Sequence, residues 1–289
     1  MMFTDHPPPR PSLPIRLITY NIRYAASHRA PNEEPWPIRC PKLATQLQFT
    51  TSGFESAFIC HQEVLHPQLQ DLARQLGPRW AYIGQGRDGG TEGEYSPIFY
   101  VPHVWKCDDW RTIWLSETPN VPSRGWDAVL NRIVTVGEFT HRRTGVRIVV
   151  MSTHFDHVGT KAREESAKLI VSVVREVREG RNGRRAAAVI LGGDFNSQPD
   201  DLGYKIITAP DSGLVDVRGC VAEEKRYGNE HTYTSFGETD DAPKRIDFLF
   251  VTNDAGSKVA TYGVLSNRFD DGVYISDHRP VVADLELHL

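Results

Sequence analysis

The sequence lacks the features that identify several large classes of protein. It contains no run of about 18 apolar residues, so we expect no membrane-spanning helix. Its first residues, "MMFTDHPPPRPSLPIRL", lack the apolar stretch of a secretory signal, which favours a cytoplasmic location. The formal net charge is −4, so no overall basic field would attract nucleic acid.

Cysteine is scarce and scattered. The four cysteines, Cys40, Cys60, Cys107 and Cys220, form no CxxC pair, which argues against a zinc knuckle. In a cytoplasmic protein they would be reduced thiols, and two disulfides are the alternative. The remaining composition is ordinary. Of the 289 residues 39% are hydrophobic and 24% are charged, which is enough apolar material for one large α/β domain or two small ones.

Segments with strand character outnumber those with helix character. The expected strands cover residues 15–22, 56–62, 80–84, 96–101, 132–140, 146–155, 186–193, 245–252 and 279–287. The clearest helix covers 161–179, where an apolar stripe lies opposite charged residues, and a second helix covers 66–76. Several strands follow one another without a helix between them, which favours a mixed, mostly antiparallel α/β sandwich. We predict a monomer with one domain over residues 15–289, preceded by a proline-rich arm at 1–14.

Acids, amides and histidines gather where the apolar strands end. The residues at these positions are Asn21, Glu63, His154, Asp156, Asp194, Asn196, Asp247, Asp277 and His278. Any one of them is explained by a cap or a turn. Six strand boundaries that share the same few residue types point instead to a functional rim. In "VILGGDFNSQPD", an extended chain would put Asp194 and Asn196 on one face.

This set of side chains suits the hydrolysis of a phosphate ester. Carboxylates and amides without cysteine partners are hard oxygen ligands, which favour Mg²⁺, Mn²⁺ or Ca²⁺ over zinc. A histidine beside an acid, as in Asp277-His278, can have a raised pKa and act in proton transfer or as a cation. Phosphate-ester hydrolysis needs a metal, a base for water and donors for the developing charge.

Six short motifs, in order along the chain, resemble those of one family. They are "TYN" (19–21), "QE" (62–63), "THFDH" (153–157), "GDFN" (193–196), "RIDFLF" (245–250) and "SDHRP" (276–280). Together they are similar, in order and spacing, to the endonuclease/exonuclease/phosphatase superfamily, the DNase I-like group. The resemblance implies a four-layered α/β sandwich with two facing sheets. It also implies a metal-dependent phosphodiesterase, nuclease or phosphatase in which water attacks directly, without a covalent intermediate.

By position, the resemblance implies a set of cation ligands. Glu63 matches the main metal carboxylate, and Asn21 lies beside it. Asp277 would be either a further ligand or the partner of His278. The implied cofactor is Mg²⁺ or Mn²⁺, with Ca²⁺ as the alternative.

The resemblance implies catalytic roles for a second set of residues. Asp194 would orient or deprotonate the attacking water, and Asn196 would bind the phosphate. His154 and His278 would hydrogen-bond the scissile phosphate and stabilise the charge that it develops. Asp247 would orient His154.

Three residues outside these motifs are candidates for substrate contact. Arg87 and Tyr95 belong to the glycine-rich stretch "GRDGGTEGEYS" (86–96), which is either a mobile loop or a wall that faces the substrate. Trp126 lies in a polar loop, where an aromatic side chain can stack on a substrate. His61 precedes the motif "QE", but strand alternation would point it away from the next side chain, so we expect a structural histidine.

Two hypotheses of other classes stay open at this stage. The chain could be a non-catalytic binding module on the same fold, although Glu63, Asp194 and both site histidines are present. It could also be a zinc metallohydrolase that uses His154, His157 and His278, although these lack an HExxH-like spacing. For a phosphoesterase, the negative charge favours a small phosphoester or a short single strand of nucleic acid over a duplex.

Overall fold

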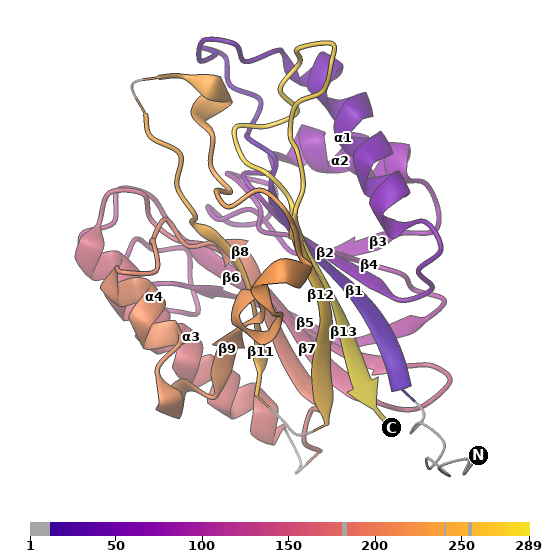
Figure 1. The fold of residues 1–289 in the computed structure, drawn as a ribbon. Coiled ribbons are helices and arrows are strands. Elements are labelled where there is room, and N and C mark those ends of the chain that lie inside the picture. Colours follow the sequence, from indigo (N-terminus) through magenta and orange to yellow (C-terminus); the bar gives the residue numbers. More distant parts are fainter. Residues whose placement is uncertain (1–11, 181–183, 240, 254–255) are drawn as a thin grey trace.

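Two β-sheets lie face to face, with helices on both outer sides (Figure 1). The computed structural model describes residues 12–180, 184–239, 241–253 and 256–289. The helices are α1 (Trp36–Thr51), α2 (His66–Leu76), α3 (Thr160–Glu179) and α4 (Leu202–Ile207), with short 3₁₀ turns η2 (Pro210–Ser212), η3 (Val217–Cys220), η4 (Glu223–Lys225) and η5 (Ser235–Gly237). The strands are β1 (Ser12–Asn21), β2 (Ala57–Gln62), β3 (Ala81–Ile83), β4 (Ile98–Tyr100), β5 (Trp105–Trp114), β6 (Ile133–His141), β7 (Arg147–His154), β8 (Ala188–Asp194), β9 (Leu214–Asp216), β10 (Arg226–Gly228), β11 (Asp247–Thr252), β12 (Ser257–Val264) and β13 (Val281–His288).

Both sheets are mixed and mostly antiparallel. The first has seven strands in the order β10-β12-β13-β1-β2-β4-β3, and the second has six in the order β5-β6-β7-β8-β11-β9. The parallel pairs are β1 with β2, β10 with β12, and β7 with β8. Helices α1 and α2 pack on the first sheet, and α3 and α4 pack on the second (Figure 1). The predicted four-layered α/β sandwich is therefore confirmed.

The strand directions bring the polar strand ends to one rim. Strands β1 and β2 run parallel and end at Asn21 and Gln62. Strands β7 and β8 also run parallel and end at His154 and Asp194. Because β11 runs antiparallel to β8, its first residue, Asp247, pairs with Asp194. Strand β13 is antiparallel to β1, so the residues that precede it reach the same rim.

The predicted stripe of α3 forms a core with the outer face of the second sheet. Its residues Ala167, Ile170, Val171, Val174 and Val177 are buried with side chains of β7, β8 and β11. The amphipathic pattern therefore gave the correct inward face of this helix. No helix within the described ranges has the length and apolar character needed to cross a membrane.

Helix α1 and strands β5 and β12 are not predicted by the sequence patterns. Pro37 and Pro41 both lie in α1, and proline normally argues against the interior of a helix. The helix forms because Cys40, Leu43 and Leu47 are buried against the first sheet. Strands β5 and β12 each carry a register shift, which interrupts the alternation that would have revealed them.

The proline-rich arm is shorter than predicted. Strand β1 begins at Ser12, so residues 12–14, which were assigned to the arm, pair with β13 instead. The pairing gives the backbone of residues 12–14 partners in β13, which an arm in solvent would not have. The rest of the expected arm, residues 1–11, lies outside the described residues.

Two glycines let β8 fit closely between its neighbours. A Cβ on Gly192 would lie 3.1 Å from Cβ of Cys60 in β2, on the facing sheet. A Cβ on Gly193 would lie 2.5 Å from the carbonyl oxygen of Thr153 in β7. The apolar run of β8 therefore ends in glycine because larger side chains would separate the strand from both neighbours.

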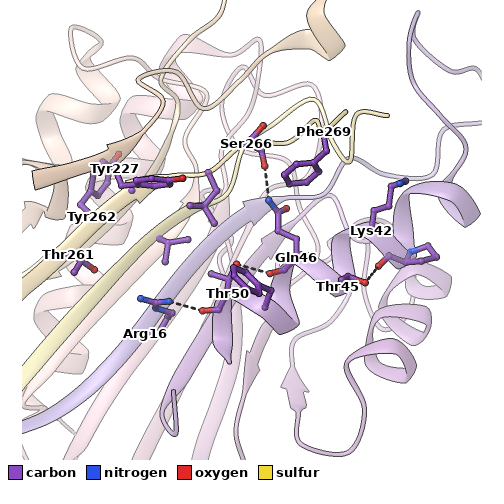
Figure 2. Close-up of a pocket in the computed structure, with 15 residues that line it drawn as sticks. Arg16, Lys42, Thr45, Gln46, Thr50, Tyr227, Thr261, Tyr262, Ser266 and Phe269 are labelled. Carbon is purple, nitrogen blue, oxygen red and sulfur yellow. Dashed lines mark hydrogen bonds between the residues drawn. The ribbon is translucent and has the colours of Figure 1, made fainter. Parts of the chain in front are cut away.

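An apolar groove of about 1110 Å³ lies on the first sheet (Figure 2). Arg16 of β1 donates to the carbonyl oxygen of Thr50 at 2.7 Å, and Gln46 of α1 donates to that of Ser266 at 2.7 Å. These bonds join α1 to β1 and to the segment after β12. None of the rim residues lines this groove.

We expect Gly193→Ala to lower the free energy of unfolding by about 1–3 kcal/mol, because the added methyl group would collide with the backbone of Thr153. The matched control is Gly219→Ala, where a Cβ meets nothing within 4 Å. It should change the free energy by no more than about 0.5 kcal/mol. Urea denaturation measures both, and equal stability of the two variants would contradict the close approach of β8 to β7.

Candidate active site

The rim surrounds a cleft of about 540 Å³. Its lining is rich in charged and amide side chains and consists of Arg23, Tyr24, Glu63, Arg87, Glu94, Leu130, Arg132, His154, His157, Asp194, Asn196 and His278. The groove of Figure 2 is larger, but none of these residues lines it. The chemistry of the side chains therefore places the candidate active site in the smaller cleft.

Asp194, the last residue of β8, is the centre of a hydrogen-bond network. Its Oδ2 accepts from Nδ2 of Asn21 at 3.0 Å, and its Oδ1 accepts from the backbone N–H of Asn196 at 2.9 Å. Oδ2 also lies 3.4 Å from Nε2 of His154 and 3.6 Å from Nε2 of His278. Asn196 has a φ of 45°, so the chain turns here. The backbone is therefore not extended through Asn196, although Asp194 and Asn196 both line the cleft.

The environment of Asp194 shifts its titration toward neutral pH. Burial, and then the negative charge of Asp247, raise the pKa of Asp194 to about 7. The charge of His278 and the hydrogen bonds from Asn196 and Asn21 oppose this rise. A carboxylate with such a pKa can both accept and release a proton near neutral pH, as a general base must.

His278, which precedes β13, is paired with Asp247. Its Nδ1 lies 2.8 Å from Oδ2 of that carboxylate. Burial lowers the pKa of His278, but nearby carboxylates, first Asp247 and then Asp194, raise it to about 10. The imidazole is therefore a cation at neutral pH. The prediction that Asp247 orients His154 is wrong, because the start of β11 delivers this carboxylate to His278.

His154, the last residue of β7, is neutral. Burial and the positive charges of Arg132 and Arg87 hold its pKa well below the usual value. Its Nε2 lies 3.1 Å from Nδ2 of Asn196, which also donates to the carbonyl oxygen of Phe155 at 3.0 Å. The two site histidines thus differ in charge although both approach the same carboxylate.

Glu63 and Asp277 provide oxygen atoms beside Asn21. Nδ2 of Asn21 donates to Oε1 of Glu63 at 3.0 Å, and the backbone N–H of Tyr24 donates to Oε2 at 3.2 Å. Burial raises the pKa of Asp277, and the charge of Glu63 adds to this rise against the opposing charge of His278. A buried carboxylate, Asp277, and a partly exposed one, Glu63, that repel each other are a donor set into which a hard divalent cation fits.

A buried arginine outside the motifs joins the two sides of the site. Arg39 of α1 is fully buried, and its guanidinium donates to the carbonyl oxygens of Ile22 at 2.7 Å, Ile275 at 3.0 Å and Arg23 at 3.0 Å. These carbonyls belong to the segment that follows β1 and to the one that precedes His278. No sequence signal reveals this role, because the partners are backbone groups up to 236 residues away.

Three further charged residues of the cleft wall are absent from the sequence-based set: Arg23, Arg132 and Glu94. Arg132 is only 4% exposed, and its Nη2 lies 3.0 Å from Nδ1 of His157. Its Nε lies 3.5 Å from Oδ2 of Asp156, which also accepts backbone N–H groups of the neighbouring loops. Asp156 thus supports the loop rather than lining the cleft. Single basic residues in loops carry no motif, so only the fold reveals them.

Of the three residues predicted to contact substrate, Arg87 lines the cleft and the other two do not. Tyr95 is buried, and its hydroxyl lies 3.0 Å from Nδ1 of His66, because its side chain is directed to α2. Trp126 has a φ of 50° in a turn outside the cleft lining. The structure thus directs Tyr95 away from the cleft, whereas contact of Trp126 with a substrate stays a prediction. His61 is buried and bonded to a backbone carbonyl of β1, in keeping with its structural interpretation.

The structure does not bring together the three histidines of the zinc hypothesis. Within the described residues, Asp194, Asp247 and His278 are the one group of potential ligands whose atoms lie within 4.8 Å of one another. His157 contacts Arg132 instead. These three side chains could hold a metal ion, and without one the ion pair with Asp247 raises the pKa of His278.

Comparisons with known proteins agree with this geometry. The model of the Endonuclease/Exonuclease/phosphatase family matches residues 159–278. The crystal structure of an endonuclease/exonuclease/phosphatase from Bacteroides vulgatus is 35% identical, with a TM-score of 0.82, and the match covers 95% of this chain and 99% of that one. The chain belongs to the endonuclease/exonuclease/phosphatase family. The resemblance carried by the six motifs is thereby confirmed.

Other similar proteins differ in how they are named. A mannosyl-6-phosphatase from Bacteroides thetaiotaomicron is 33% identical, with a TM-score of 0.80 over 94% of this chain and 99% of that one. D. rerio TDP2, in complex with a single-strand DNA product, shares the fold at 16% identity, with a TM-score of 0.71 over 94% and 98%. An uncharacterised protein of Acanthamoeba polyphaga mimivirus is 24% identical over 181 residues. That match spans 60% of this chain and 63% of the viral protein.

We expect Asp247→Asn to lower the pKa of His278 by about 1–3, because the imidazolium loses its nearest opposite charge. NMR titration of the histidine ring protons, in EDTA, measures this shift. His154 should remain neutral in both proteins. The control is Asp211→Asn, which removes an exposed carboxylate paired with Arg175 of α3 and should leave the titration of His278 unchanged. A changed titration of His154 with an unchanged His278 would restore the original assignment of Asp247.

Proposed function

We propose that this protein is a divalent-cation-dependent phosphoesterase that hydrolyses a small phosphomonoester by direct attack of water. The observation that carries the proposal is the position of Asp194. A carboxylate with a pKa of about 7 lies between a neutral imidazole, His154, and a cationic one, His278. A base for water and donors for phosphate thus meet at one point of the cleft. Membership of the family supports the same reaction class.

Asp194 is the base in this proposal. It accepts a proton from the attacking water as the water oxygen forms its bond to phosphorus. The bond from phosphorus to the leaving oxygen breaks on the opposite side, so no covalent intermediate forms. Hydrogen bonds from Asn21 and from the backbone of Asn196 hold the carboxylate in one orientation, which reduces the cost of positioning the water.

His278 stabilises the negative charge that develops on the phosphate. Asp247 occupies its Nδ1, which leaves Nε2–H for a phosphate oxygen. With a pKa of about 10, the imidazole keeps its charge at neutral pH. The amide of Asn196 and the neutral ring of His154 add polar contacts on the other side of Asp194.

Glu63 and Asp277, with Asn21 beside them, are the residues that would hold the cation. Bound Mg²⁺ or Mn²⁺ would neutralise phosphate oxygens and so lower the barrier to attack by water. Carboxylate and amide oxygens suit these ions, and Ca²⁺ as well, better than they suit zinc.

The cleft favours a small monoester over a strand of nucleic acid. Its volume of about 540 Å³ lies within the range of small-molecule sites, about 300–1,000 Å³. Arg23 and Arg132 line it, and two guanidinium groups match a terminal phosphate, which carries more charge than a diester phosphate. The relative named mannosyl-6-phosphatase supports a sugar phosphate for this chain as well.

We expect Asp194→Asn to reduce kcat by at least about 100-fold, because an amide cannot accept the proton of water. The unfolding midpoint should not fall, since the replaced carboxylate is buried beside another negative charge. Release of p-nitrophenol from p-nitrophenyl phosphate and bis-p-nitrophenyl phosphate, with Mg²⁺, measures activity. Asp211→Asn serves as the surface control. Full activity in a folded Asp194→Asn variant would contradict its role as base.

The same assay separates the alternatives. Faster cleavage of the diester than of the monoester would contradict the proposed substrate class. If the wild type hydrolysed neither compound with Mg²⁺, Mn²⁺ or Zn²⁺, the result would favour a non-catalytic binding module.

We expect Glu63→Gln to raise the Mg²⁺ concentration for half-maximal activity by about tenfold or more, because the cation loses a charged ligand. Calorimetric titration of the protein with Mg²⁺ gives a second readout that does not depend on turnover. The matched control is Glu165→Gln, which removes a carboxylate paired with Lys168 on the surface of α3. An unchanged Mg²⁺ titration in Glu63→Gln would show that the cation binds elsewhere.

A further inference from the structure

Arg87 and Glu94 form an ion pair on the wall of the cleft, and the reaction described above uses neither. Nη1 of Arg87 donates to Oε2 of Glu94 at 2.8 Å. The backbone N–H of Arg87 also donates to the carbonyl oxygen of Glu94 at 3.0 Å. The side chains are 12% and 14% exposed, so both are largely buried yet reach the cleft. A charged pair in this place needs a physical explanation.

The hairpin that carries the pair has independent supports. Gly93 has a φ of 75°, and a Cβ there would lie 2.9 Å from Cγ of Arg87. Nε1 of Trp114 donates to the carbonyl oxygen of Arg87 at 2.7 Å. Nδ2 of Asn131 donates to Oδ1 of Asp88 at 2.9 Å. These contacts hold the hairpin closed without the ion pair. The closure of the hairpin therefore does not explain why Arg87 and Glu94 are paired.

The pair keeps hydrogen-bonding capacity that the described part of the chain does not use. Oε1 of Glu94 accepts no hydrogen bond there, whereas Nε of Arg87 lacks a partner but is buried and is not available to a ligand. Burial, and then the charge of Glu63, raise the pKa of Glu94 to about 7. A carboxylate held near another carboxylate, with spare polar atoms at a cleft, is typical of a binding site.

We propose that Arg87 and Glu94 recognise adjacent hydroxyl groups on the alcohol part of a sugar or polyol phosphate. A hydroxyl group both donates and accepts hydrogen bonds, and the pair offers an acceptor and several donors side by side. Glu94 accepts from one hydroxyl, and Arg87 donates to the oxygen of its neighbour. This inference rests on the proposed function, because it describes the leaving group of the same substrate.

The position of Glu94 also disfavours a longer anionic substrate. A strand of nucleic acid carries a phosphate on every nucleotide, and a second phosphate near Glu94 would meet a like charge. A neutral, hydroxyl-rich alcohol meets no such repulsion. The pair therefore selects the alcohol part of the substrate, whereas the residues around Asp194 act on the phosphate.

The test compares two monoesters in wild type and Glu94→Gln. One is mannose 6-phosphate, and the other is phenyl phosphate, whose leaving group has no neighbouring hydroxyls. Release of inorganic phosphate with Mg²⁺ measures kcat/KM for both. We expect the wild type to prefer mannose 6-phosphate and Glu94→Gln to reduce this preference about tenfold to a hundredfold, as expected for one lost charge-assisted hydrogen bond.

Two further variants complete the experiment. Glu92→Gln is the matched control, since Glu92 is an exposed acid on the same hairpin, and it should keep the wild-type preference. Arg87→Lys keeps the charge but loses the planar fork of the guanidinium. It should reduce the preference for mannose 6-phosphate in the same direction, which keeps the test decisive if Glu94→Gln folds poorly.

The outcomes separate this inference from the proposed function. An unchanged preference in Glu94→Gln, or an equal loss of activity on both esters, would overturn the inference while the wild type remained a phosphatase. Equal use of both esters by the wild type would overturn it too. Failure of the wild type to release phosphate from either ester, with Mg²⁺ or Mn²⁺, would overturn the proposed function together with the inference.

Discussion

The site depends on a buried row of alternating charge formed by Asp247, His278 and Asp194. Nδ1 of the imidazole lies 2.8 Å from Asp247, and its Nε2 lies 3.6 Å from Asp194. Two buried carboxylates would repel each other, so an imidazolium between them stabilises the group. Its positive charge cannot cancel both negative charges and the loss of water, which leaves Asp194 with a pKa of about 7. The arrangement that makes this row costly for folding also leaves a carboxylate that titrates near neutral pH beside a cationic imidazole.

Strand direction makes this row possible, and Arg39 keeps its surroundings in place. The ends of β7 and β8 and the start of β11 come together because β7 and β8 are parallel and β11 is antiparallel to them. Arg39 then joins the segment after β1 to the one before β13 through backbone carbonyls. Glu63, Asp277 and His278 adjoin strands of the first sheet, and His154 and Asp194 end strands of the second, so side chains from both sheets share one frame. Such preorganisation reduces the reordering that a reaction requires.

Much of the fold was predictable because its signals are local. The stripe of α3, the alternation in most strands and the motif "GDFN" each lie within a few neighbouring residues. Helix α1 escaped prediction because Pro37 and Pro41 contradict its helical pattern, and packing on the first sheet overrides them. The roles of Arg39 and Glu94 were not predicted. The hydrogen-bond partners of Arg39 and the place of Glu94 in the cleft depend on segments that are distant in the sequence.

The sequence by itself determined which chemical groups stand at the strand ends, and hence the expectation of a hard cation and phosphate chemistry. It also determined the family. Only the tertiary structure decided which groups meet: Asp247 binds His278 rather than His154, and Tyr95 is directed to His66 rather than to the cleft. The physical reason is that alternation along a strand assigns a side chain to a face, whereas its partner depends on register between strands that are distant in the sequence.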